Sequence, residues 1–245
     1  MKKFHFTKNY AFFIGALADN KFHKHYAQQI SVTSNLQMAL TQENGHEHNG
    51  QVFFINSQVI HKLESVTEQL TLLINPVSSI GHQLHINFSG NEFMLRENEL
   101  SIVLTNQLDL FQKNEIGFEI LCSKIDEAFF DFKCKCEKTI HINDNRILRA
   151  IEYMDKHFET PLNVEQVAEL CFLSPTRFLH LFKEKTNLNF RRYQLWNKLV
   201  LSLPYLMDNT VVDTAYKFGF SDNSHYTRTF KETFGVTPKF LSAKR

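Results

Sequence analysis

The sequence is poor in cysteine, with four in 245 residues: Cys122, Cys134, Cys136 and Cys171. Cys134 and Cys136 have no second pair at the spacing of a zinc site, and Cys171 lies on a stripe of apolar residues at helical spacing. Unpaired cysteines of this kind are typical of a reducing compartment. We therefore expect free thiols in a cytoplasmic protein.

Long apolar runs and a large net charge are missing as well. No run after Met1-Lys2-Lys3 is long enough for a signal peptide, and none elsewhere is long enough for a membrane helix. The formal net charge is only +1, but residues 1–140 carry 12 Lys and Arg against 15 Asp and Glu, whereas residues 141–245 carry 15 against 11. An acidic half followed by a basic half favours a DNA-binding module joined to a different domain. With 43% hydrophobic residues, the chain is long enough for two globular domains.

The segment from Thr210 to Phe240 predicts a helix-turn-helix. Apolar residues recur at helical spacing up to Phe218, and Gly219 supplies the positive φ that ends a helix. Ser221 or Asp222 can cap the next helix, in which aromatic residues four apart form a buried stripe. The stripe consists of Tyr226, Phe230 and Phe234, and the outer face consists of Asn223, Ser224, Thr227, Arg228 and Lys231. An ordinary solvated helix remains the alternative for this segment alone.

A related unit lies upstream, which favours the helix-turn-helix interpretation. Phe182-Lys183-Glu184 recurs as Phe230-Lys231-Glu232. Ala168 stands six positions before Ser174, just as Ala215 stands six positions before Ser221. Ser174-Pro175 is a capping residue followed by proline at the first helical position. Phe178 and Phe182 form the buried stripe of this unit. Its outer face consists of Thr176, Arg177, His180 and Lys183.

Outer faces of this composition fit the DNA major groove, where side chains divide between base edges and phosphates. We expect base contacts from Thr176, Arg177, His180, Asn223, Ser224 and Thr227. We expect phosphate contacts from Ser174, Lys183, Ser221, Arg228 and Lys231.

The tandem pattern resembles the C-terminal DNA-binding domain of AraC/XylS-type transcription regulators, over about residues 142–240. The residues that carry the resemblance are Gly219 to Asp222, His225 to Lys231 and Gly235 to Pro238. The sequence departs from the family pattern in three places: Phe172 and Asn187 stand where glycine is usual, and Pro204 lies inside the connecting helix. The resemblance implies promoter DNA and RNA polymerase as partners, and a cupin-like effector barrel in the N-terminal half.

In the N-terminal half, several short β-prone segments predict a small barrel or sandwich. They are residues 11–15, 26–32, 51–55, 59–63 and 70–75, with a polar, turn-rich run at 41–50. Two amphipathic helices follow at about 97–114 and 117–133. We expect these helices to form a dimer interface through Leu100, Leu104, Leu121 and Ile125. The alternative is that they merely close the barrel.

One cluster of histidines raises the question of a metal. His23 and His25 have the spacing of a cupin metal-binding pair, and His61 is a possible third ligand. No glutamate follows His25 at the usual short distance, and eight histidines are scattered through this half. We therefore expect no metal and no cofactor, and a pocket-lining or surface role for the pair.

These observations predict an α+β protein with a cupin-like effector-sensing and dimerisation domain at 1–137 and an all-α DNA-binding domain at 138–245. The helix-turn-helix units are expected at about 162–185 and 210–233, joined by a helix from Phe190 to Leu203. The predicted function is sequence-specific regulation of transcription, with a small-molecule effector or a partner protein sensed by the N-terminal domain. The rival interpretation is a cupin-type metalloenzyme with an appended helical module, and a third is a regulator that responds to no ligand.

Overall fold

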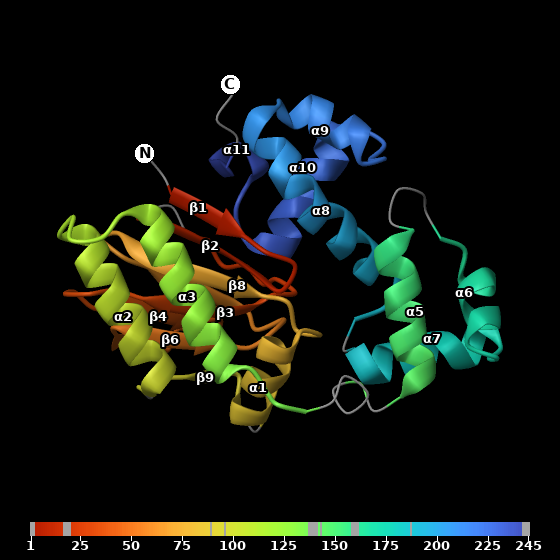
Figure 1. Cartoon of the computed structure of the whole chain (residues 1–245), viewed down its shortest axis with the longest axis horizontal. Coiled ribbons are helices and arrows are strands. Elements are labelled where there is room, and N and C mark those ends of the chain that lie inside the picture. The colour runs from red at the N-terminus through yellow and green to blue at the C-terminus, as the bar shows by residue number, and fades with distance from the viewer. Residues whose placement is uncertain are drawn as a thin grey trace. The chain divides into compact units, whose positions relative to one another are not determined.

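The computed structural model describes residues 3–16, 21–88, 90–95, 97–136, 142, 144–157, 162–186 and 188–241. The chain divides into two compact units, Met1–Cys134 and Lys135–Arg245, and each is considered by itself (Figure 1). The linker expected at Cys134–Thr139 lies partly outside the described residues, and Asn187 lies outside them too. No helix in the described ranges has the length and apolar character needed to cross a membrane.

The N-terminal unit is built on two antiparallel sheets. The larger has the order β1-β2-β8-β3-β6-β9 and the smaller the order β5-β4-β7. The strands are β1 (Lys3–Phe6), β2 (Tyr10–Gly15), β3 (Gln28–Val32), β4 (Met38–Gln42), β5 (Glu47–Gly50), β6 (Val52–Ile55), β7 (His61–Glu64), β8 (Gln69–Ile74) and β9 (Phe93–Met94). The expected small β fold is therefore present, but as two separately hydrogen-bonded sheets and not as one closed barrel.

Both faces of the larger sheet are buried, which explains the apolar runs of β2 and β6; polar residues of β3 and β8, such as Gln29 and Thr71, are buried as well. Phe54 and Leu72 point to a core shared with the helices of this unit. Phe53 and Ile55, their neighbours in the pleat, point to a second core beneath the smaller sheet. Because alternate residues enter different cores, a polar residue is excluded from most positions of β6.

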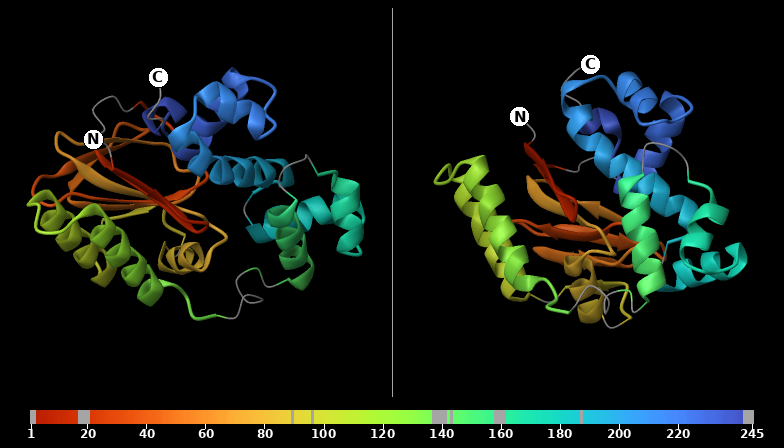
Figure 2. Two further views of the ribbon diagram at one scale, coloured as in Figure 1. Left: turned by 45° about the horizontal axis from the view of Figure 1, so that its top comes forward. Right: turned by 45° about the vertical axis from the view of Figure 1, so that its right-hand side comes forward.

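Three helices cover the first of these cores: α1 (Ser79–Phe88), α2 (Glu99–Gln112) and α3 (Phe118–Phe132). The last two confirm the helices expected from sequence, and Figure 2 shows them along one face of the larger sheet. Asn98 begins α2 with a capping box, in which its side chain accepts from the amide of Ser101 and the Ser101 hydroxyl accepts in return. Helix α1 was not among the elements predicted from the sequence.

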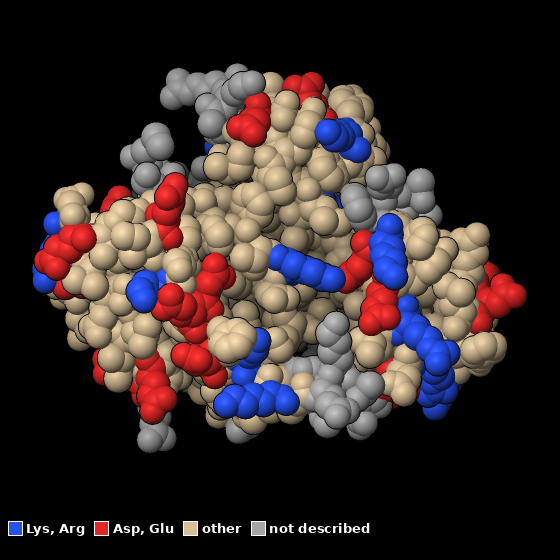
Figure 3. Space-filling view, viewed as in Figure 1, with Lys and Arg blue, Asp and Glu red and all other residues tan. Residues whose placement is uncertain are grey.

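The residues expected at the dimer interface are buried within the unit itself. Leu100 is 5% exposed, and the side chains of Leu104, Leu121 and Ile125 are fully buried in the core below the helices. The choice of these residues was wrong, because the stripe that was assigned to a partner packs on the chain's own sheet. The hydrophobic residues that α2 and α3 do expose are Ile102, Val103, Ile120 and Phe130. Figure 3 shows Asp and Glu side chains gathered over the same two helices.

Part of the run expected as turn, residues 41–50, is strand. Glu47–Gly50 forms β5, which pairs with β4, and Gly45 makes the turn between them at a φ of 84°. β5 is an edge strand with polar side chains, so no apolar alternation marks it in the sequence.

The C-terminal unit is helical throughout its described ranges. Its helices are α5 (Asn145–Lys156), α6 (Val164–Leu170), α7 (Pro175–Thr186), α8 (Phe190–Asp208), α9 (Val211–Lys217), α10 (Asn223–Phe234) and α11 (Pro238–Leu241). Asp144 caps α5 as expected, and Arg146 holds the pKa of this carboxyl below its usual range by hydrogen bonding to it.

The connecting helix is longer than expected, because α8 runs through Pro204 and ends five residues beyond Leu203.

Candidate nucleic-acid interface

The first helix-turn-helix consists of α6 and α7. The side chain of Asn163 caps α6 by accepting from the amide of Glu165, at 3.0 Å. Ser174 caps α7 in the same way through the amide of Arg177, at 3.4 Å, and Pro175 is the first helical residue as predicted. The boundaries of α7 therefore follow from local sequence.

The second helix-turn-helix consists of α9 and α10. Thr210 caps α9 through the amide of Asp213, and Asp222 caps α10 through the amide of His225, at 2.7 Å. The hydrogen bond from that amide is the main reason why the pKa of Asp222 lies below its usual value. Gly235 closes α10 in the left-handed conformation, at a φ of 75°.

The turns of the two units are built alike. In the first, the amide of Leu173 donates to the carbonyl of Ala168, and in the second the amide of Phe220 donates to the carbonyl of Ala215, both at 3.0 Å. Both alanines are fully buried, so the two helices of each unit can approach closely. The residue before each donor has a positive φ, 55° at Phe172 and 68° at Gly219. The internal repeat is therefore a repeat of backbone conformation, even where the residue types differ.

Aromatic residues fix the inner faces of α7 and α10, as predicted. Phe178 and Phe182 are fully buried with ring centroids 5.5 Å apart, and Tyr226 and Phe230 are fully buried at 5.7 Å. Burial is the main cause that raises the pKa of Tyr226, whose hydroxyl lies 2.8 Å from the hydroxyl of Ser202. These buried rings therefore determine which face of each helix points outward.

The opposite faces carry the residues predicted to contact DNA. Ten of these eleven side chains are exposed: Ser174, Thr176, Arg177, His180, Lys183, Ser221, Asn223, Ser224, Arg228 and Lys231. Thr227 is half-buried, and its hydroxyl donates to the side chain of Asn223 at 3.4 Å. Ser221 is held by the side chains of Asp222 and His225, at 3.1 and 3.0 Å.

The four cations on these faces are available to an anionic ligand. Arg177, Lys183, Arg228 and Lys231 pair with no carboxylate in the part of the chain that the structure describes. The nearby acid Glu232 is instead paired with Arg192 of α8, at 2.6 Å.

One outward residue of α7 was not among those predicted to contact DNA. Leu179 is 40% exposed on α7, three positions after Thr176 and four before Lys183, so it shares their face. The helical period was the available signal, because it places Leu179 on the face of Thr176 and Lys183.

Helix α8 holds both units. Its residues Tyr193 and Asn197 donate to the carboxylate of Asp155 on α5, at 3.2 and 2.9 Å. Further along, the Ser202 hydroxyl meets Tyr226 of α10. The 19 residues of α8 span about 28 Å at 1.5 Å per residue. The two recognition faces are therefore presented by one continuous helix.

Comparison with known proteins agrees with this geometry. The family model described as a helix-turn-helix domain matches residues 167–243. The HTH-type transcriptional activator RhaS of Enterobacter sp. is 29% identical over 105 residues, which cover 42% of this chain and 38% of RhaS. The C-terminal unit is of the AraC/XylS type.

Other relatives differ in how much of the chain they match. Regulatory protein PocR of Salmonella typhimurium is 30% identical over 99 residues, or 40% of this chain and 33% of PocR. The match to PocR and RhaS therefore spans little more than a third of those proteins. Probable transcriptional regulator LumQ of Photobacterium leiognathi is 21% identical over 199 residues, with 77% of each chain covered. The crystal structure of apo ToxT from Vibrio cholerae has the same fold, with a TM-score of 0.59, 14% identity and coverage of 96% of this chain and 98% of ToxT.

Proposed function

We propose that this AraC/XylS-type protein is a sequence-specific regulator of transcription that binds promoter DNA through α7 and α10. The observation that carries the proposal is the pair of matching helix-turn-helix units, each with a buried aromatic stripe and an exposed polar and basic face. One continuous helix holds both, so α7 and α10 enter successive major grooves about one DNA turn, roughly 34 Å, apart. RNA polymerase is the further partner that a regulator of this kind requires, and the cytoplasm is where it acts.

Within this proposal the outward residues keep the roles expected from sequence. Arg177, His180 and Asn223 read base edges, and Lys183, Arg228 and Lys231 bind phosphates. Leu179 adds an apolar contact that suits the methyl group of thymine. The domain boundary lies near residue 137, and residues 138–245 form the DNA-binding domain.

The direct test is selection of bound fragments from genomic DNA with the purified full-length chain. We expect the recovered fragments to share one site with two short conserved blocks separated by about one helical turn, near 10 base pairs. Recovery of fragments with no common sequence would contradict specific binding. A matched variant, Arg177→Ala with His180→Ala, should lose sequence preference in one block and retain it in the other.

The N-terminal unit is proposed to sense a small molecule or a partner protein, and not to act as an enzyme. The support is the fold shared with ToxT, of which one crystal structure is described as bound to an unsaturated fatty acid. An unsaturated fatty acid is therefore the first probe for this chain. A change in DNA affinity on its addition to full-length protein, absent with residues 138–245 alone, would support sensing by the N-terminal unit.

A further inference from the structure

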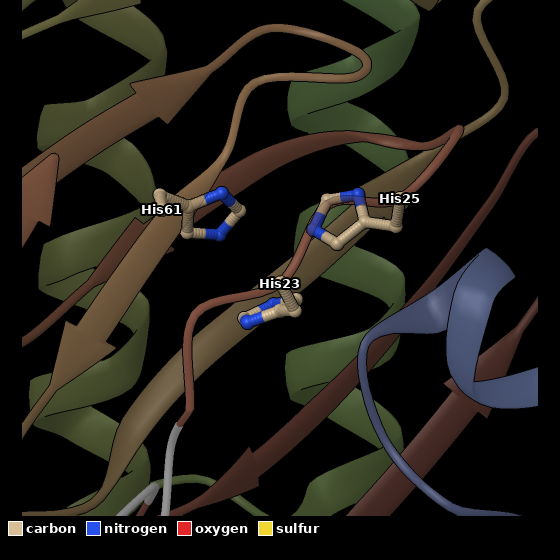
Figure 4. A group of neighbouring side chains, drawn as sticks. All are labelled: His23, His25 and His61. Atoms are coloured by element: carbon tan, nitrogen blue, oxygen red, sulfur yellow. The ribbon is translucent and has the colours of Figure 1, made fainter. Parts of the chain in front are cut away.

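Three histidines of the N-terminal unit lie together although they come from two segments of the chain. His23 and His61 form an antiparallel bridge, in which each amide donates to the other's carbonyl at 3.0 Å. His25 follows two residues after His23, ahead of β3, and His61 begins β7. Figure 4 shows the three rings gathered around a common space.

The spacing of the rings is close to that of a coordination site. Ring centroids are 4.5 Å apart for His23 and His61, 5.3 Å for His25 and His61, and 5.5 Å for His23 and His25. One ring nitrogen from each residue lies within 4.8 Å of the other two. Bonds of 2.0–2.1 Å to a tetrahedral ion place ligand nitrogens about 3.4 Å apart. Side-chain rotations that shorten the nitrogen–nitrogen separations by about 1.4 Å or less are therefore enough to complete the site.

Hydrogen bonds to the backbone fix which nitrogen of each ring has a lone pair. The Nδ1 atoms of His23, His25 and His61 lie 2.9, 2.8 and 3.0 Å from the carbonyls of Lys21, Ala27 and Val59. Since a carbonyl only accepts, each Nδ1 carries the hydrogen, and in each neutral ring Nε2 is the basic atom. Histidine ligands of metals are commonly oriented in this way, by a carbonyl on the nitrogen that does not coordinate.

A second observation that points to a bound ligand is the buried ring of His61. Its side chain is 1% exposed, and its Nε2 has no hydrogen-bond partner among the described residues. A buried acceptor without a donor costs about 1–3 kcal/mol.

The surroundings of His25 point the same way. Its Nε2 lies 2.8 Å from Oε1 of Gln29, so that two acceptors face each other unless the Gln29 amide is reversed. A cation between the rings would remove this conflict, because the lone pair of His25 Nε2 would bind it. The Gln29 oxygen could then bind the same cation as a further ligand. Gln29 is itself held from behind, because its Nε2 donates to Ser31 at 3.0 Å.

We propose that His23, His25 and His61 form a site for a divalent transition-metal ion, with Zn²⁺ as the best match, bound through three Nε2 atoms. Three neutral imidazoles exclude Mg²⁺ and Ca²⁺, which select oxygen ligands, and suit Zn²⁺ in a site that keeps a fourth position for water or Gln29. The ion would join the segment ahead of β3, in the larger sheet, to β7 in the smaller sheet. This proposal replaces the expectation of no metal and does not depend on DNA binding.

The test is Zn²⁺ titration of full-length protein that has been stripped with a chelator, followed by calorimetry. A second cluster, His82, Cys134 and Cys136, also brings three ligand atoms within 4.8 Å, so the titration uses a Cys134→Ser, Cys136→Ser background. We expect one ion per chain and a rise in melting temperature on binding. Co²⁺ bound at the histidine site should show no thiolate charge-transfer band.

Two variants decide the assignment. His23→Gln, which alters the most exposed of the three rings, and His61→Gln should each weaken Zn²⁺ binding by at least about tenfold. His46→Gln and His85→Gln, at exposed positions of the same unit, should leave it unchanged. Unchanged affinity in His23→Gln, whose folding circular dichroism can verify, would overturn the proposal, as would absence of bound ion in the parent protein.

Discussion

Phe172 and Gly219 occupy equivalent points in the two turns, and only one of them suits the conformation. Both have a positive φ, and Phe172 exposes 85% of its surface, so little packing offsets its strain. A residue with a Cβ in this conformation destabilises the folded state by about 1–2 kcal/mol relative to glycine. Part of that difference is cancelled, because glycine has more conformational freedom to lose when the chain folds. Phe172→Gly should therefore stabilise residues 138–245 by about 1 kcal/mol in denaturant unfolding. Gly219→Ala is the matched control and should destabilise them, whereas a loss of stability in Phe172→Gly would mean that the phenyl ring packs.

Arg177 and Lys183 test the division between base and phosphate contacts. Arg177→Ala should cost about 1–3 kcal/mol on the selected site and relax base preference in one block. Lys183→Ala should weaken binding to all sequences and reduce the slope of log affinity against log salt by about one. Titrations of selected and random duplexes at several salt concentrations separate the two. Equal losses on both duplexes for Arg177→Ala would contradict its role.

Asp222 links the second unit to pH. Its folded pKa lies below the ordinary 3.8, so the unfolded chain binds a proton more readily. The stabilisation is complete above the ordinary value and is lost as the pH falls through the folded pKa. Asp222→Asn keeps a capping oxygen that does not titrate. Between pH 6 and pH 3, the melting temperature of residues 138–245 should fall less in Asp222→Asn than in the parent, and an equal fall would refute the link.

Among the elements, α8 carries the clearest conflict with local preference. Pro204 is exposed inside the helix, where proline lacks an amide and clashes with the carbonyl four residues earlier, at a cost of up to about 3 kcal/mol. Pro204→Ala should raise the melting temperature of residues 138–245 and leave the bases read by each unit unchanged. Leu201→Ala, at another partly exposed position of α8, should have little effect. A lower melting temperature in Pro204→Ala would show that the proline is required by the local backbone.

Elements differed in how far sequence predicted them, for physical reasons. Helices such as α5 and α7 carry their capping residues and their buried stripes within a dozen residues, so their boundaries followed from local pattern. Strand β5 is stabilised by pairing with β4, which no local pattern shows. Helix α1 was missed although one of its constraints is local: a Cβ on Gly81 would lie 2.3 Å from the carbonyl oxygen of Asn75, six positions earlier.

The same reasoning explains the outcome at the sites. The outward residues of α7 and α10 could be predicted from the sequence, because the helical period places them opposite the buried aromatic stripe. The helices α2 and α3 were predicted, but whether Leu104 and Ile125 face a sheet or a partner depends on what lies beneath them. The three histidines are separated by up to 38 positions and meet only through strand pairing, so their sequence spacing was not decisive.

At the scale of the whole molecule, self-association stays a prediction, now placed on exposed residues of α2 and α3. Ile102 and Ile120 are each about half exposed, so they can contact a second copy. Sedimentation of the full-length chain at tens of micromolar should show a dimer. Ile120→Glu should shift it towards monomer, and Val66→Glu, at an 86% exposed loop position, should not. A monomeric parent protein would remove the dimer claim and leave the DNA claim untouched.

The fragment 138–245 should behave differently from the full chain. Because both helix-turn-helix units lie in one chain, we expect it to bind the selected DNA as a monomer. Mobility shifts at increasing protein concentration should show a single complex with one fragment per duplex. Two fragments per site would mean that α8 does not place both units on one duplex.

The outward faces of α7 and α10, which α8 connects, carry different side chains, so the DNA site that they bind is not symmetric. A dimer with twofold symmetry reads a palindrome and binds it equally in either orientation. Here one face offers Arg177 and His180 and the other offers Asn223 and Thr227, so the target site has a beginning and an end. Inverting such a site would turn the bound protein around with respect to the gene. The protein therefore imposes a direction on the DNA that it binds.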